Sequence, residues 1–156
     1  MSLAPDVRYA GFWRRLAASM IDIVILMPVL MLLLYLMYGA TYFEWLAERT
    51  DPLAVYGAGD AVISNLLPIV LMAYFWMHYL GTPGKLLLGC HVVDAKSGVA
   101  LNLRQIIFRN VGYLVSLFTF GLGFLWIAKD VRKQGFHDKI AGSVVILVET
   151  IGKKTV

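Results

Sequence analysis

Three long runs of apolar residues dominate the hydrophobic pattern of the chain. Leu16 to Tyr38 covers 23 residues with Asp22 as its only formal charge, and Ala61 to Leu80 covers 20 residues without Asp, Glu, Lys or Arg. A helix rises about 1.5 Å per residue, so both runs are long enough to cross about 30 Å of hydrocarbon. The pattern therefore predicts two transmembrane helices, at residues 16–38 and 61–80.

The third run, Val111 to Ala128, is also uncharged, but it contains Gly112, Gly121 and Gly123. Its 18 residues are long enough to span a membrane. A turn within Phe120 to Gly123 would instead make it a re-entrant hairpin that returns to the same face, which is tolerated where protein buries the turn. Both alternatives stay open from the sequence.

Shorter patterns lie between and after these runs. Residues 101–109 (LNLRQIIFR) have apolar residues on one side, which is typical of an interfacial amphipathic helix. Residues 90–94 and 99–101 flank a glycine-containing turn and are predicted to form a short cytoplasmic hairpin. Residues 143–148 are β-branched and too short to span, so they are expected to form a strand or a half-buried segment. The expected fold is an all-α membrane protein, a small helical bundle that forms one domain over residues 1–156.

The composition agrees with a membrane environment. Hydrophobic residues make up 60% of the 156 residues and charged residues 15%, whereas soluble domains are about half apolar. A small soluble fold has a large surface-to-volume ratio and could not bury so much apolar surface. The net charge of +4 comes from Lys and Arg in loops beside the apolar runs. This placement favours the lipid bilayer and its anionic headgroups as partners and disfavours nucleic acid.

The distribution of Lys and Arg also predicts the orientation. Residues 1–15 are basic and the loop at 39–60 is acidic, which places the N-terminus in the cytoplasm. Residues 81–110 are basic again and return to the cytoplasmic side. A third span would put the basic tail outside, against this rule, whereas a re-entrant third run would keep it inside. The basic residues of the tail are Lys129, Arg132, Lys133, Lys139, Lys153 and Lys154.

A polar stripe lies on the first apolar run. Arg15, Ser19 and Asp22 follow a spacing of i, i+4 and i+7, so they share one face of the helix. Arg15 and Asp22 are about 10 Å apart along the axis, so we expect a third group between them. An unpaired carboxylate this far inside an apolar helix costs about 2.5 kcal/mol or more. Asp22 is therefore either an ion or proton site or a structural acid paired elsewhere, and the sequence leaves both open.

The tail sequence GFHDKIAG supplies partners for this stripe. Arg15 with Asp138, and Asp22 with Lys139 or His137, are the chemically sensible pairs. The chain has no second cluster of His or Cys near His137. His137 is therefore interpreted as a turn residue rather than a metal ligand, and no metal site is predicted.

The glycine-rich sequence GTPGKLLLG does not match a nucleotide-binding loop. A phosphate loop requires Ser or Thr directly after its lysine, and here Leu86 follows Lys85. We expect a turn that ends the second helix and places Lys85 at the level of the headgroup phosphates. No catalytic motif is present, so neither an enzyme activity nor a cofactor is predicted.

These motifs resemble those of the bacterial RDD family of integral membrane proteins, named for one arginine and two aspartates. The opening YAGFWRRLAASMID is similar to the N-terminal signature of the family, in which an arginine seven positions before the aspartate corresponds to Arg15 and Asp22. The sequence GTPGKLLLGCHVVDAKSG is similar to its glycine-lysine loop. The tail FHDKIAGSVVI is similar to its second aspartate motif and assigns Asp138, with Ser143 where threonine is usual.

The resemblance implies a multi-pass protein of the bacterial cytoplasmic (inner) membrane with a role in transport that includes cation/proton exchange. Under this hypothesis Asp22 accepts a proton or a monovalent cation, Arg15 biases its charge state and Asp138 orients Arg15. Two or three spans do not easily enclose a pathway, so a homo-oligomer or a membrane partner is expected. The alternative is a non-transporting accessory or assembly protein in which the same polar cluster is structural.

Overall fold

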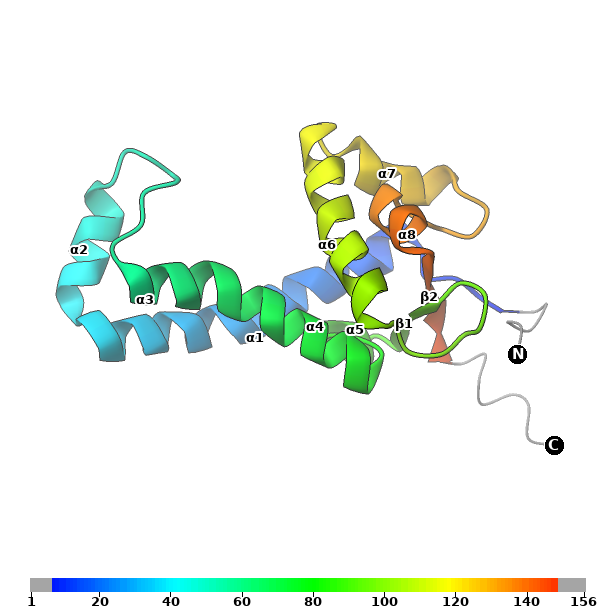
Figure 1. The fold of residues 1–156 in the computed structure, drawn as a ribbon, viewed down its shortest axis with the longest axis horizontal. Helices are drawn as coiled ribbons and strands as arrows, with labels where there is room; N and C mark the ends of the chain where they lie inside the picture. Colours follow the sequence, from blue (N-terminus) through cyan, green and yellow to red (C-terminus); the bar gives the residue numbers. More distant parts are fainter. Residues whose placement is uncertain (1–6, 149–156) are drawn as a thin grey trace. The chain divides into compact units, whose positions relative to one another are not determined.

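The computed structural model describes residues 7–148, so Lys153 and Lys154 of the basic tail lie outside the described residues. The described chain is mostly helical with one small antiparallel sheet, which confirms the expected class of fold (Figure 1). Its described residues form two compact units, residues 23–72 and residues 7–22 with 73–148. Each unit is described by itself below.

The two predicted transmembrane helices are present. The first is α1 (Phe12–Tyr38), which begins before the apolar run itself. The second run forms the π-helical η1 (Ala61–Leu66) and α4 (Leu67–Tyr79), and the short α3 (Ala58–Asp60) directly precedes them. Both α1 and the stretch Ala58–Leu87 are long and apolar enough to cross a membrane.

The third apolar run is sharply bent. It forms α6 (Leu103–Phe118) and α7 (Leu122–Lys129), whose axes differ by 101° (Figure 1). Phe120 and Gly121 turn the chain with positive φ values of 53° and 79°, at the position of the turn in the re-entrant alternative. The bent pair is either a broken span or a re-entrant loop, so the described chain has two or three candidate spans.

The helix predicted at residues 101–109 is present as the first part of α6, which is longer than the predicted segment. A capping box starts the helix: Asn102 Oδ1 accepts a hydrogen bond from Gln105 N at 2.9 Å, and Gln105 Oε1 accepts one from Asn102 N at 3.2 Å. The helix then continues without a break into the third apolar run. Arg109 therefore lies within a long helix and is 1% exposed.

The sheet joins two segments that are far apart in the sequence. Strand β1 (Cys90–Asp94) pairs antiparallel with β2 (Ser143–Leu147), with Cys90 opposite Leu147 and Asp94 opposite Ser143. The predicted strand at 143–148 is thus confirmed, but the predicted hairpin partner at 99–101 is wrong. All residues of β2 are buried, so its β-branched side chains gain more from pairing there than the partly exposed 99–101 segment would.

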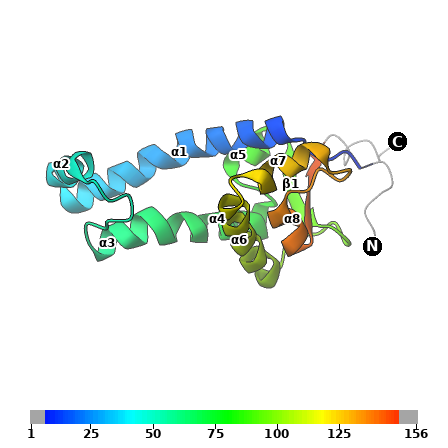
Figure 2. The same cartoon turned by 90° about the horizontal axis from the view of Figure 1, so that it is seen from above.

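Small residues allow three helices to pack closely. Helix α8 (Phe136–Ala141) contacts α6 in both views (Figures 1 and 2). A Cβ at Gly112 would lie 2.5 Å from His137 Cα, and a Cβ at Gly123 would lie 2.5 Å from Ser116 Oγ. The glycines at these contacts are therefore needed for packing within the chain.

The unit of residues 23–72 contains α2 (Ala40–Glu48) and a buried acid, Asp60. The Asp60 carboxylate accepts hydrogen bonds from Tyr42 Oη at 2.9 Å, Ser64 Oγ at 2.6 Å and Tyr56 N at 2.9 Å. The acid satisfies these donors beside the packed rings of Tyr38, Tyr42 and Tyr56. In the sequence it is one of the acids of the loop at 39–60.

Candidate functional site

Asp138 is the centre of a buried ion network. It lies in α8 and is 0% exposed. Its Oδ2 lies 2.5 Å from Arg15 Nη1 and its Oδ1 lies 2.7 Å from Arg109 Nη1. The backbone N–H of Gly135 donates to Oδ2 at 2.9 Å. The expected pair of Arg15 and Asp138 is thus present, and the network connects α1, α6 and α8.

The two arginines keep Asp138 ionised. Burial alone raises the pKa of the carboxyl, but the charges of Arg109 and Arg15 outweigh it and hold the pKa of Asp138 well below its usual range. Asp138 therefore remains a carboxylate throughout the physiological range. It is a fixed counter-ion rather than a group that exchanges protons.

Arg109 is the member of this network that sequence reasoning missed. Its guanidinium lies 5.0 Å from the ring centroid of Trp76 and 5.9 Å from that of Tyr113, and it donates to Ser143 Oγ. In the sequence, Arg109 is the last residue of the amphipathic stretch 101–109, a position that predicts a place at the membrane interface. The sequence signal that indicates its burial is the helical pattern that continues without a break beyond Arg109 into the third apolar run.

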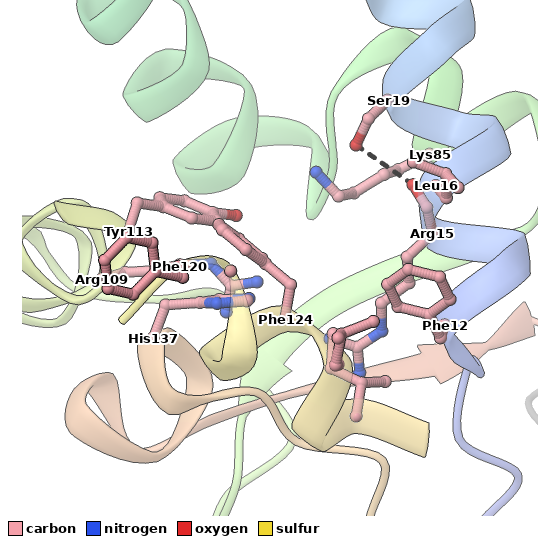
Figure 3. Close-up of a pocket in the computed structure, with 13 residues that line it drawn as sticks. Phe12, Arg15, Leu16, Ser19, Lys85, Arg109, Tyr113, Phe120, Phe124 and His137 are labelled. Carbon is pink, nitrogen blue, oxygen red and sulfur yellow. Dashed lines mark hydrogen bonds between the residues drawn. The ribbon is translucent and has the colours of Figure 1, made fainter. Parts of the chain in front are cut away.

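Arg15 uses its remaining donors on backbone carbonyls. Its Nε donates to Ala10 O at 2.9 Å and its Nη2 donates to Lys133 O at 2.6 Å. Ser19 Oγ donates to Arg15 O at 3.1 Å, the dashed line in Figure 3. Ser19 is therefore bonded to its own helix, and within residues 7–148 no side chain bridges Arg15 to Asp22.

Asp22 makes a separate contact with the start of α5 (Pro83–Leu87). Its carboxylate accepts hydrogen bonds from Thr82 Oγ1 at 2.5 Å and from Gly84 N at 2.7 Å. Gly84 is required for this approach, because a Cβ there would collide with Ala18 O and lie 3.0 Å from Asp22 Cγ. The Gly-Thr-Pro-Gly sequence thus presents two neutral donors to the acid of α1. The predicted single cluster is divided into two contacts.

The predicted pairing of Asp22 with Lys139 or His137 is wrong. Lys139 forms an ion pair with Asp130. His137 stacks on Tyr113 with ring centroids 4.4 Å apart. Burial lowers the pKa of His137 to about 3, so the imidazole is neutral. The described residues contain no group of three or more His, Cys, Asp or Glu that could hold a metal ion.

A cavity of about 520 Å³ adjoins the Asp138 network (Figure 3). Lys85 lines it, is 7% exposed, and points its amine into the open space in Figure 3. The side chain of Lys85 is therefore largely covered by protein, and its amine faces the cavity. The other polar and aromatic residues of the wall are Arg15, Ser19, Arg109, His137, Phe12, Tyr113, Phe120 and Phe124.

These features define a helical membrane protein with two or three candidate spans and a buried arginine-aspartate network. The model of the RDD family matches residues 9–142. The chain therefore belongs to the RDD family.

Similar proteins are found in Bacillus subtilis. YckC is 34% identical over 144 residues, which cover 87% of this chain and 83% of YckC. YteJ, whose name describes it as a membrane protein, is 28% identical over 88% of this chain and 80% of its own length. YxaI is 29% identical over 88% of this chain and 96% of its own length. No solved structure matches the chain at a significant level.

Proposed function

We propose that this RDD-family protein exchanges protons for monovalent cations across the bacterial cytoplasmic membrane, with Asp22 as the exchanging carboxylate. The observation that carries the proposal is the neutrality of its partners, Thr82 and Gly84. No ion pair joins Asp22 to a basic side chain within residues 7–148. A carboxylate without a counter-charge in an apolar helix is costly, and binding a proton or a small cation removes that cost.

The contacts of Asp22 suit a group that changes its charge. The Thr82 hydroxyl can donate to the carboxylate and can accept from the protonated acid, so it keeps a hydrogen bond in both states. Carboxylate and hydroxyl oxygens are also ligands that hard cations prefer. Asp138 cannot take this role, because two arginines already neutralise it.

Exchange also requires a particular assembly and orientation of the chain in the membrane. Two or three spans do not enclose a pathway, so exchange requires a homo-oligomer or a membrane partner. The basic residues before and within the start of α1 favour a cytoplasmic N-terminus by the positive-inside rule.

Proton-coupled Na⁺ or Li⁺ flux in vesicles containing the full chain tests the proposal. Wild type is compared with Asp22→Asn and with Glu48→Gln, which changes an exposed acid in α2. We expect Asp22→Asn to lose exchange at matched protein levels and Glu48→Gln to retain it. Wild-type exchange by Asp22→Asn would refute the carboxylate mechanism.

A second candidate function is that of a non-transporting accessory or assembly protein. It is favoured by the Asp138 network, which ties three helices together and needs no transport role to explain it. Absence of any wild-type flux, together with loss of folding in Asp22→Asn, would favour this candidate over exchange.

A further inference from the structure

Lys85 is a buried cation for which the described residues provide no acid. Its Nζ lies over the ring of Trp76, 5.8 Å from the ring centroid, in a cation–π interaction. Within residues 7–148 it forms no ion pair, and no hydrogen bond of its amine is found. Buried charges are normally paired, because desolvation of an isolated ammonium is costly.

The cavity that Lys85 enters carries excess positive charge. Arg15 and Arg109 line the same cavity but share a single carboxylate, that of Asp138. Arg109 Nε is buried and has no hydrogen-bond acceptor among the described residues. The neighbouring His137 is neutral at physiological pH. The cavity therefore contains donors and a positive charge that an anion would satisfy.

The remaining wall of the cavity is apolar. Phe120 is 97% exposed at the turn between α6 and α7, and Leu16 and Leu125 are exposed on α1 and α7. These helices belong to the candidate spans, so exposed apolar side chains on them contact hydrocarbon in a bilayer. An anion that enters here would therefore have its charge near Lys85 and an apolar portion beside Phe120 and the two leucines.

We propose that this cavity binds the phosphate headgroup of an anionic membrane lipid, with Lys85 as its principal cationic ligand. Arg109 Nε supplies a second donor, and the acyl chain lies against the aromatic and leucine side chains of the wall. The volume of about 520 Å³ lies within the usual range of small-molecule sites. This site is separate from the exchange proposed at Asp22 and does not depend on it.

Lipid-dependent thermal stability of the full chain in detergent micelles tests the site. Phosphatidylglycerol is titrated against phosphatidylcholine and against inorganic phosphate. The variants are Lys85→Gln, the charge-conserving Lys85→Arg, and Lys96→Gln, which changes an exposed lysine. We expect phosphatidylglycerol to raise the melting temperature of wild type, Lys85→Arg and Lys96→Gln. We expect Lys85→Gln to require about tenfold more lipid, or more, for the same rise.

Three results of this titration would overturn the proposal. The first is an unchanged phosphatidylglycerol response in Lys85→Gln, and the second is an equal response to phosphatidylcholine in wild type. The third is a full response to inorganic phosphate alone, which would indicate a site for a free anion. Native mass spectrometry of the wild type tests the site without any variant, so its result does not depend on the folding of a variant. Absence of bound phosphatidylglycerol in that measurement would also reject the site.

Discussion

His137 makes the stability of the protein depend on pH. In the folded chain it is 3% exposed and its pKa is about 3, mainly because of burial, with an opposing effect of Asp138. Its ordinary value of 6.5 applies to the unfolded chain. Below that value the unfolded chain binds a proton that the folded chain does not, so acid favours unfolding. The loss begins as the pH falls through 6.5 and ends near pH 3.

The size of this effect follows from the two pKa values. One proton of difference changes the free energy of unfolding by about 1.4 kcal/mol per pH unit within the window. Between about pH 8 and about pH 5 the contribution of His137 is therefore about 2 kcal/mol of lost stability. His91 is shifted in the same direction by burial, so the effect of His137 must be measured as a difference between variants.

The measurement is the free energy of unfolding in mixed detergent micelles at both pH values. The variant His137→Phe keeps a ring beside Tyr113 and removes the titration, and His137 Nδ1 has no hydrogen-bond partner within residues 7–148 to be lost. We expect wild type to lose about 2 kcal/mol more than His137→Phe on acidification. The control His78→Phe changes an exposed histidine. Equal acid sensitivity of wild type and His137→Phe would refute the assignment of a neutral buried imidazole.

Three further substitutions test the packing and the polar networks by the same unfolding measurement. Asp138→Asn leaves two buried guanidiniums without their counter-charge and should cost about 3–5 kcal/mol. Gly112→Ala places a Cβ 2.5 Å from His137 Cα and should cost about 1–3 kcal/mol. Tyr42→Phe removes a donor from the buried carboxylate of Asp60 and should cost about 1–3 kcal/mol.

Matched controls separate these effects from general sensitivity. Gly11→Ala adds a methyl group where no other atom lies within 4 Å, and Tyr35→Phe alters an exposed ring. Both should change the free energy of unfolding by less than about 0.5 kcal/mol. If Asp138→Asn were as mild as these controls, the buried ion network would not contribute to stability.

Local patterns predict the two long helices and offer the bend between α6 and α7 as one of two alternatives. The two runs at 16–38 and 61–80 are recognisable because a membrane helix must be apolar over its whole length. The bend at Phe120 and Gly121 follows from a glycine that accepts positive φ. Each of these signals lies within the segment that it describes, so no tertiary information is needed.

Pairing between distant segments is harder to predict from one sequence. Strand β1 has a glycine turn and a short apolar segment directly after it, which resembles a hairpin, yet its partner is β2 near the other end of the described chain. Register and partner depend on which strand buries more side chain in the folded protein. The buried side-chain area of β2 depends on α8, which precedes it and places it beside β1, so a single sequence does not reveal it.

The arginine and two aspartates that identify the family have different partners. The type of partner decides which of their contacts can be predicted from the sequence. Complementary charge predicts the contact of Arg15 with Asp138, because opposite ions have few other partners in an apolar environment. Asp22 instead binds the hydroxyl of Thr82 and a backbone N–H at Gly84. Every residue except proline has a backbone N–H, so sequence alone does not mark the one that approaches Asp22. The difference has a chemical consequence: two arginines pair with Asp138, whereas neutral dipoles hold Asp22, and for this reason the proposed exchange is assigned to Asp22.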